Sequence, residues 1–560
     1  MKSFLTTTLA TGLALGQTAS AMTPGFSHHH MAKRQIDHAA ILASTSSHIK
    51  AYDIPVPIDH FHNDTRYEPH SDAQFHLRYW LDTSNYRPGG PVIVLHSGEF
   101  DSTARLPYLE HGIVPVLTKA FGGVGLVMEH RYYGKSFPME TTSTENLRFL
   151  SVEQALADTA YFARNITFPG LEHVNLTAGA APWIIYGGSY AATVAALSRK
   201  IYPDVFWGAI SSSGVPQSID DYWQYLEAAR HFAPKGCVEA TQKLTHIVDN
   251  ILFGGDKEQI DKLKELFHLQ GLENDEFGET IASLGGIMSL QSTMWDIEED
   301  SPHLGYYCGA VTSDAPLFAS MRHRITRARH FVSVGGYEHQ VNELAMPLLN
   351  WAGIVRFNLR DALKGSCKGK SARECFSNRF LNTDETSLDW ERSWKYQTCI
   401  ENGFFITGTG VPKDQLPLIS RAVTRDYAAW HCPNLFNITD LPNVDNINKF
   451  GGFDFSHSRL AHLDGAQDPW RAAGVHAIGQ KDRKSTVSEP FILVDYGVHH
   501  WDEFGLASGT EEQDLPPRQV VDAQQAMVGF VGEWLKEWDA EKGGKHTKDT
   551  TSDSAEADEL

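Results

Sequence analysis

The chain has 560 residues, which is long for one ordinary domain and favours either two domains or one large domain with an insertion. Hydrophobic residues make up 42% and charged residues 21%, so the composition is that of a folded globular protein and excludes a disordered or fibrous chain. The formal net charge of −21 would repel a polyanion, so nucleic acid is not expected as a partner.

Residues 1–21 are typical of a secretory signal peptide. Lys2 precedes a Thr-rich apolar stretch, and Ala19 and Ala21 supply the small side chains of a signal-peptidase site. The apolar stretch is too short for a transmembrane helix and no later stretch is longer, so no membrane span is expected.

Residues 22–50 predict a short pro-segment or linker that contains the dibasic pair Lys33-Arg34. His28, His29 and His30 are metal-binding side chains, but three adjacent residues in a linker do not fix a coordination geometry. Neither a metal site nor a cofactor is therefore predicted.

The sequence also predicts glycosylation and disulfide bonds, as expected along the secretory route. N-x-S/T sequons begin at Asn63, Asn165, Asn175 and Asn437. The cysteines are Cys237, Cys308, Cys367, Cys375, Cys399 and Cys432. They show no CxxC pair and no zinc spacing, so disulfides are expected. Local spacing favours the pairs Cys367–Cys375, Cys399–Cys432 and Cys237–Cys308.

The C-terminal residues, 540–560, contain almost no large apolar side chain, which predicts a disordered tail. The chain ends in Ala557-Asp558-Glu559-Leu560, which resembles an ER-retrieval tetrapeptide. An ordinary acidic tail is the alternative, so the sequence leaves secretion and ER retention both open.

From residue 51 onward the sequence predicts an α/β domain. Gln74 to Leu81 alternates polar and apolar residues, as in an antiparallel strand with one solvated face. Pro91 to His96 and Val124 to Met128 are continuous apolar runs, which is typical of strands buried on both faces. Helical patterns at Leu106 to Phe121 and Ser151 to Phe162 alternate with these strands, which predicts a parallel sheet.

Between Asp220 and Phe405 the pattern changes to amphipathic helices that hold most of the cysteines, which indicates an inserted helical domain. Strand character returns at Phe491 to Val494, and a last helix is expected near Gln519 to Trp538. We therefore predict the following division: signal peptide 1–21, pro-segment 22–50, first part of the α/β domain 51–216, helical cap 217–449, second part of the α/β domain 450–539 and tail 540–560.

A nucleophile elbow is indicated around Ser189. A buried strand, Trp183 to Tyr186, is followed by Gly187-Gly188-Ser189-Tyr190-Ala191 and then by a helical stretch. The small neighbours allow a sharp turn, and the helix N-terminus directs amides toward a developing oxyanion. Alanine at position 191 departs from the G-x-S-x-G pattern, whose last residue is glycine.

A serine nucleophile needs a histidine base and an orienting carboxylate, which in this fold class follow in the order Ser, Asp, His. Asp468 precedes Pro469 in a turn that follows a predicted strand. His499 and His500 lie on a loop after the strand that ends at Val494. Ligand sites of open α/β sheets lie at that edge, so these residues are candidates for one site.

The chain resembles the serine peptidases of the prolyl carboxypeptidase and dipeptidyl peptidase II type, which include fungal proline-specific peptidases. The resemblance is carried, in this order, by Glu129 to Ser136, Gly187 to Tyr190, Trp394 to Cys399, Asp468 to Trp470 and Gly497 to Asp502, and it spans roughly residues 50 to 540. It implies an α/β-hydrolase fold with a helical cap and hydrolysis of peptide bonds after proline.

By position, the resemblance implies Ser189 as the nucleophile, Asp468 as the orienting acid and His499 as the base, with His500 as the residue to test beside it. The backbone amide of Tyr190 would bind the oxyanion. A second donor would come from residues 96–99. The sequence of this loop departs from the glycine-richer family pattern, so the second donor stays open.

Three further residues near these motifs have competing interpretations. Trp470 either forms a wall of the proline pocket or packs in the core. Glu129 and Arg131 are expected to form a buried structural ion pair near the site.

The predicted function is a secretory-pathway serine peptidase that acts after proline in peptides or proteins, most simply as a carboxypeptidase-type exopeptidase. A proline-specific endopeptidase, a dipeptidyl peptidase, an esterase on the same fold and a non-catalytic binding module are the alternatives. The oligomeric state and the pH optimum stay open.

Overall fold

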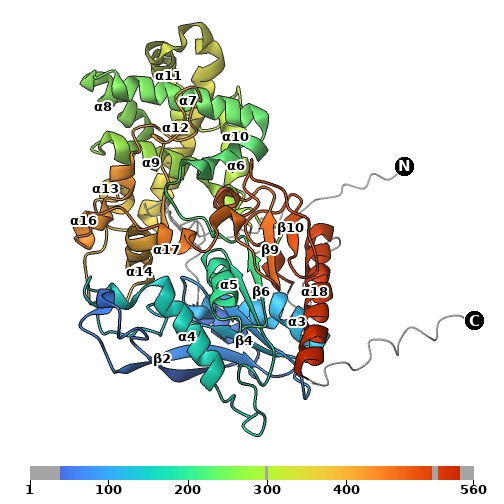
Figure 1. Ribbon diagram of the computed structural model, residues 1–560. Coiled ribbons are helices and arrows are strands. Elements are labelled where there is room, and N and C mark those ends of the chain that lie inside the picture. Colours follow the sequence, from blue (N-terminus) through green and yellow to red (C-terminus); the bar gives the residue numbers. More distant parts are fainter. Residues whose placement is uncertain (1–37, 297–299, 507–514, 543–560) are drawn as a thin grey trace, which may run out of the picture.

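The computed structural model describes residues 38–296, 300–506 and 515–542, and it consists of a sheet flanked by helices and a helical lobe beside it (Figure 1). The predicted signal peptide, the three adjacent histidines, the dibasic pair and the C-terminal tetrapeptide lie outside the described residues. Within the described residues, no helix combines the length and the apolar character needed to cross a membrane.

The central sheet has eight strands in the order β1-β2-β4-β3-β5-β6-β9-β10. Their bounds are β1 Lys50–Pro57, β2 Gln74–Asp82, β3 Val92–His96, β4 Val124–Met128, β5 Trp183–Gly188, β6 Gly208–Ser212, β9 Leu460–Gly465 and β10 Phe491–Val494. β2 runs antiparallel to β1 and β4, and all other neighbours are parallel. The parallel strands therefore end at one common edge.

The predicted fold class is confirmed: this is an α/β-hydrolase fold with an inserted, mainly helical cap. Every residue of β3, β4, β5, β6 and β9 is buried, as the continuous apolar runs indicate. One face packs against α4 (Val152–Asn165) and α5 (Tyr190–Ile201). The other packs against α2 (Leu106–Glu110), α3 (Ile113–Phe121) and α18 (Arg518–Lys542).

The helical stretch expected from Leu106 to Phe121 is formed by two helices, α2 and α3, with a break at His111 and Gly112. Gly112 precedes α3 in a non-helical conformation, φ −90° and ψ −146°. A Cβ at Gly112 would lie 2.5 Å from the carbonyl oxygen of Glu503, so a loop from the far end of the chain packs against the break.

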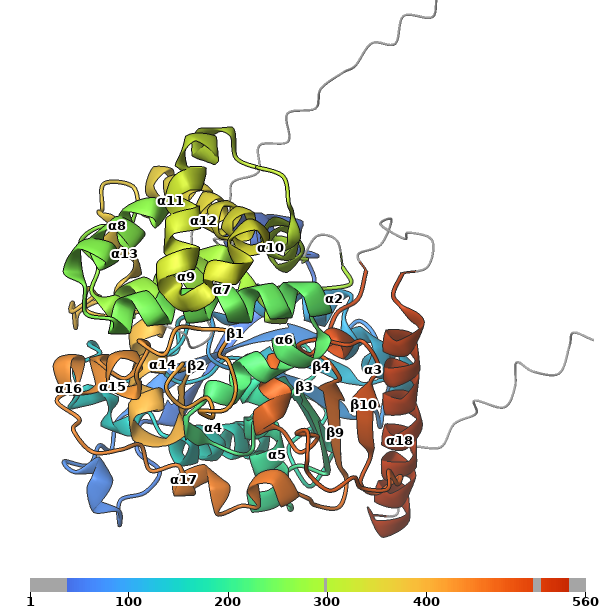
Figure 2. The same ribbon diagram turned by 90° about the horizontal axis from the view of Figure 1, so that it is seen from above.

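The cap leaves the sheet after β6 and returns at β9 (Figure 2). Its helices are α6 Glu227–Phe232, α7 Lys235–Phe253, α8 Lys257–Phe267, α9 Asn274–Gly285, α10 His303–Thr312, α11 Ile325–Val332, α12 Val341–Lys364, α13 Ala372–Phe376, α14 Trp390–Gln397, α15 Arg425–Ala428, α16 His431–Leu435 and α17 Asp445–Asn448. A small parallel sheet joins β7 (Ile219–Asp221) to β8 (Gly403–Phe405). The cap has its own apolar core, which also takes in Trp470 and Ala473 from the turn after β9.

Three disulfides lie within the cap and pair the cysteines as the spacing favours: Cys237–Cys308, Cys367–Cys375 and Cys399–Cys432. The four sequon asparagines are exposed, as glycosylation requires, and glycosylation itself stays a prediction. The predicted domain boundaries at 216/217 and 449/450 fall in the connections after β6 and before β9 and also stay predictions.

Candidate active site

Ser189 lies at the sharp turn between β5 and α5, at the edge where the parallel strands end. Its backbone has φ 62° and ψ −127°, a conformation that residues with side chains rarely adopt. A Cβ at Gly187 would lie 2.1 Å from the carbonyl oxygen of Ala191, so only glycine permits this close turn. The local sequence thus dictates a strained, buried serine in the position of a nucleophile elbow.

The alanine that replaces the last glycine of the elbow pattern is accommodated by the loop after β3. A Cβ built on Gly98 would lie 3.2 Å from the Cβ of Ala191, and Gly98 has φ +70°. Because Gly98 has no side chain, the loop approaches the elbow closely despite the methyl group of Ala191.

Asp468 and His499 contact each other at the same edge of the sheet. Nδ1 of His499 lies 2.8 Å from Oδ2 of Asp468, and both side chains are buried. The backbone amide of Trp470 donates to the other carboxylate oxygen of Asp468, at 2.9 Å. Burial by itself would raise the pKa of Asp468, but the charge and hydrogen bond of His499 and the amide of Trp470 lower it below its ordinary value.

Ser213 is a positioning residue that sequence reasoning missed. Its amide donates to Leu463 of β9 at 2.7 Å, and its hydroxyl accepts the backbone amide of His500 at 2.9 Å. The same hydroxyl hydrogen-bonds to Asp468 and lowers its pKa. Ser213 thereby links the loop that holds Asp468 (the acid loop) to the loop that holds His499 and His500 (the histidine loop). Nothing in its local sequence distinguishes it from the two serines that precede it.

The two adjacent histidines have different partners. The imidazole of His500 lies 2.8 Å from the carboxylate of Glu503, and both groups are buried. A Cβ at Gly188 would lie 2.8 Å from that carboxylate and 3.2 Å from the His500 ring, so this pair sits directly against the residue that precedes Ser189. Only His499 is oriented by Asp468.

Trp470 is buried among aromatic side chains of the cap and faces the site. Its ring stacks on Tyr222 with centroids 5.3 Å apart, and Tyr225 and Phe404 contact it edge to face. The centroid of the His499 ring lies 6.5 Å from that of Trp470. Trp470 is thus a core residue of the cap and a neighbour of the candidate base, and its role as a wall of the proline pocket stays a prediction.

Gln291, in the cap turn Ile287–Ser292, holds this aromatic cluster in place. Its side-chain oxygen accepts the indole N–H of Trp470 at 2.7 Å and the hydroxyl of Tyr225 at 2.9 Å. A few residues on, Trp295 donates to the carbonyl of Trp501 and Trp501 donates to that of Thr293. One cap segment therefore contacts both the acid loop and the histidine loop.

Replacing Gln291 by leucine is expected to lower kcat/KM by roughly tenfold and to destabilise the fold. The substitution leaves two buried donors, on Trp470 and Tyr225, without their acceptor, at a cost of about 1–3 kcal/mol each. Peptide hydrolysis and thermal unfolding measure the two effects. Gln270→Leu, at an exposed cap position, is the matched control and should change neither. Equal behaviour of the two variants would contradict the role of Gln291.

The hydroxyl of Tyr190 anchors the start of α5. It accepts from the side-chain amide of Gln397 at 2.8 Å and lies 3.2 Å from Nε2 of His130. Tyr190 is the first residue of α5, so its backbone N–H belongs to the helix turn that has no intrahelical acceptor. Gln397 belongs to the segment Trp394 to Cys399, so this segment lies beside the nucleophile elbow.

The loop predicted to supply a second oxyanion donor already uses two of its amides. Ser97 donates to the carbonyl of Met128 at 2.8 Å, and Gly98 donates to Nδ1 of His96 at 3.2 Å. The second donor therefore stays a prediction.

The expected ion pair between Glu129 and Arg131 is wrong, because each has another partner. Arg78 contacts the carboxylate of Glu129 at 2.5 Å. Arg131 lies 2.6 Å from Asp158. The chain leaves the sheet after β4 and turns at residues 131–134, so the two side chains point toward β2 and α4 respectively. Both are buried and structural, as expected.

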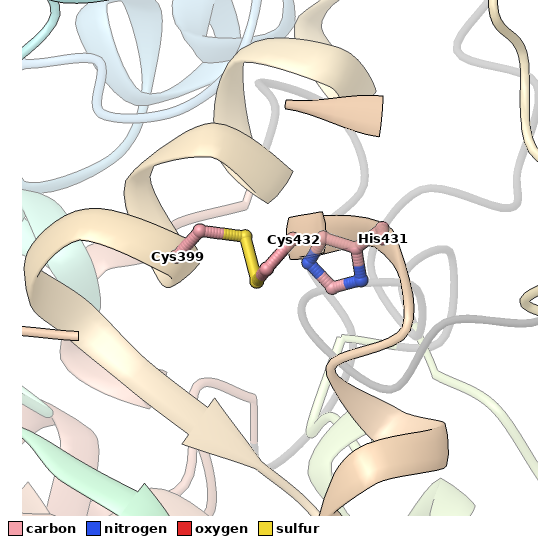
Figure 3. A group of neighbouring side chains, drawn as sticks. All are labelled: Cys399, His431 and Cys432. Carbon is pink, nitrogen blue, oxygen red and sulfur yellow. A yellow bond between two sulfur atoms is a disulfide. The ribbon is translucent and has the colours of Figure 1, made fainter. Parts of the chain in front are cut away.

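Metal-ligand side chains gather in one place in the cap, Cys399, His431 and Cys432 (Figure 3). The two sulfur atoms are joined in a disulfide, so neither is a thiolate. Nε2 of His431 lies 3.1 Å from the hydroxyl of Thr398, and burial lowers the pKa of His431 to about 3. In this oxidised form the group braces the turn after Gln397.

Comparison with known proteins identifies the family. A family model described as serine carboxypeptidase S28 matches residues 57–283 and 355–516. A probable extracellular serine carboxypeptidase of Arthroderma benhamiae is 44% identical over 490 residues, which cover 87% of this chain and 68% of the relative. The serine protease vicPa of Bipolaris victoriae is 27% identical, with 85% of this chain and 88% of the relative covered. The prolyl carboxy peptidase like protein 5 of Caenorhabditis elegans is 24% identical, with 83% of this chain and 87% of the relative covered. The chain belongs to the serine carboxypeptidase S28 family.

Proposed function

We propose that this protein is a secretory-pathway serine carboxypeptidase that hydrolyses the peptide bond after a proline through a covalent acyl-enzyme. Ser189 is the nucleophile, His499 the general base and Asp468 the acid that orients it. The observation that carries the proposal is the buried contact of 2.8 Å between His499 and Asp468 at the sheet edge that bears the strained Ser189.

In this mechanism His499 takes the proton of the Ser189 hydroxyl while the serine oxygen attacks the carbonyl carbon of the proline residue. The negative charge on the carbonyl oxygen is stabilised by the backbone N–H of Tyr190 at the start of α5. His499 then gives its proton to the leaving amine, and water resolves the ester by the reverse sequence of proton transfers. Asp468 accepts the hydrogen bond of Nδ1–H throughout and stabilises the imidazolium.

The aromatic cluster supports specificity for proline. A pyrrolidine ring has no N–H donor to satisfy within a peptide, so a flat apolar wall suits it. Trp470 presents such a wall beside His499, and its own N–H is already bound to Gln291. The name of the nematode relative, a prolyl carboxypeptidase-like protein, agrees with this specificity.

The signal-like residues 1–21, the disulfides in the cap and the name of the 44% identical relative, an extracellular carboxypeptidase, support a place in the secretory pathway. Fractionation of cells that express the full chain would distinguish secretion from ER retention.

Incubating the purified protein with three proline peptides, one free at both ends, one blocked at the N-terminus and one blocked at the C-terminus, tests the proposal by mass spectrometry. We expect cleavage after proline of the free and N-blocked peptides and none of the C-blocked peptide. Ser189→Ala should reduce the rate by at least about 10⁴-fold.

Each other outcome identifies another activity. Cleavage of the C-blocked peptide would indicate an endopeptidase, and loss of activity only with the N-blocked peptide would indicate a dipeptidyl peptidase. Absence of Ser189-dependent cleavage from mildly acidic to neutral pH would contradict proline specificity, and short-chain esters would be the next substrates to assay.

A further inference from the structure

The connection between β1 and β2 brings together three potential metal ligands outside the candidate active site. One ligand atom from each of Asp59, His62 and His70 lies within 4.8 Å of the others. We propose that these three side chains bind one Zn²⁺ ion, which cross-links the two ends of this connection.

Asp59 is held as an oriented ligand. Its Oδ1 accepts the backbone amide of Phe61 at 2.9 Å and the side-chain amide of Gln154, on α4, at 2.8 Å. Its Oδ2 lies 2.7 Å from Nδ1 of His70, and the carboxylate is buried. Hydrogen bonds of this kind on one carboxylate oxygen direct the other toward a metal, as in established metal sites.

The two imidazoles lie side by side and are open to solvent. Their rings stack with centroids 5.3 Å apart and an interplanar angle of 20°. The side chain of His62 is 48% exposed and that of His70 is 24% exposed, which gives an ion a path from solvent. Oδ1 of Asp72, which is fully exposed, lies 3.9 Å from Nδ1 of His62. Asp72 or a water molecule can complete a four-coordinate site.

The ligand set fits zinc. Two imidazole nitrogens and one carboxylate oxygen with a fourth open position form a known type of tetrahedral Zn²⁺ site, and imidazole favours zinc over calcium or magnesium. Ligand atoms around such an ion are separated by roughly 3.3 Å, given bonds of about 2.0–2.1 Å. Asp59 and His70 therefore separate by about 0.6 Å on binding, and Nδ1 of His70 coordinates the ion through its lone pair.

Isothermal titration calorimetry with ZnCl₂ on the untagged full chain tests the proposal. The sequence also has three adjacent histidines, His28 to His30, that could bind Zn²⁺ themselves, so every protein compared carries alanine at these positions. We expect one ion per chain, a thermal midpoint that rises with Zn²⁺, and visible absorption bands of tetrahedral Co²⁺ when cobalt replaces zinc. His62→Ala with His70→Ala should weaken binding at least 30-fold and remove the thermal shift and the bands.

His323→Ala with His339→Ala, at exposed positions of the cap, is the matched control and should bind as the parent does. His62→Ala alone, at the more exposed ligand, should also lose the cobalt bands, which covers the case in which the double variant folds poorly. The proposal is overturned if the parent binds no Zn²⁺ at micromolar concentration. It is equally overturned if the double variant keeps the parent's affinity, because the ion would then bind elsewhere.

Discussion

Asp468→Asn is expected to lower kcat/KM for a proline peptide by about 10⁴-fold while leaving the fold intact. The carboxylate accepts the N–H of His499, so the proton of the neutral imidazole stays on Nδ1 and Nε2 can act as the base. An asparagine amide can donate to Nδ1 instead and favours the opposite tautomer. The lowered pKa of Asp468 keeps this carboxylate ionised in mild acid, where it continues to stabilise the imidazolium.

The matched control replaces the neighbouring pair, His500→Gln together with Glu503→Gln. Removing both partners avoids leaving a buried charge without its counter-charge. Because His500 contacts Glu503 and not Asp468, we expect kcat/KM to stay within about tenfold of the parent. Steady-state hydrolysis and circular dichroism of both variants are the measurements. A larger loss from the control than from Asp468→Asn would assign the base to His500 and contradict the proposed triad.

The parts of the site that the sequence predicts are those with a local signal. Ser189 stands between a buried strand and a helix with glycines beside it, because the turn itself requires those small residues. Asp468 precedes a proline, and His499 follows a strand, so both are placed at the edge where the strands end. The sheet is predictable for a similar reason, since burial on both faces leaves a continuous apolar run.

The parts that the sequence does not predict depend on partners far away in the chain. Nothing local distinguishes His499 from His500, and the choice comes from Asp468 and Glu503 on the folded protein. Ser213 and Gln291 act through hydrogen bonds to loops that lie 287 and 179 residues away along the chain. No periodicity encodes such contacts.

The pairing of Glu129 and Arg131 failed as a prediction for the same reason. Neighbouring opposite charges suggest an ion pair, but each side chain meets a partner that only the tertiary structure supplies, Arg78 on β2 and Asp158 on α4. The break between α2 and α3 likewise follows from the packing of Glu503 against Gly112.

Buried carboxyl groups are expected to make the protein less stable at pH 8 than at pH 6.5. Burial raises the pKa of Glu279 to about 8, although the hydroxyl of Tyr427 and the amide of Asn378 donate to it, and burial raises that of Glu401 to about 8 as well. The folded-state pKa of each glutamic acid therefore lies above its unfolded value of about 4.5. The stability that each group contributes is complete below about pH 4.5 and is lost as the pH rises toward 8, because the unfolded state ionises first.

Buried histidines act in the opposite direction, most strongly at lower pH. Burial lowers the pKa of His130 to about 4 and those of His431 and His462 to about 3, so these groups disfavour the folded state below their unfolded value of about 6.5. At pH 6.5 their unfolded forms are still about half protonated, so each of them adds about 0.4 kcal/mol of stability between pH 6.5 and 8. Comparing a glutamine variant with the parent removes this contribution, because both proteins contain the same histidines.

Glu279→Gln should remove at least half of the net loss of stability over this interval. Each group that is protonated only in the folded state changes the free energy of unfolding by about 1.4 kcal/mol per pH unit, so Glu279 accounts for roughly 1–2 kcal/mol. Glutamine keeps the acceptor for Tyr427 without the charge. Urea unfolding of the parent, Glu279→Gln and the exposed control Glu140→Gln at pH 6.5 and 8 measures the difference. If Glu279→Gln loses as much stability as the parent, the buried carboxyl is ionised at neutral pH and its desolvation is compensated by the donors of Tyr427 and Asn378.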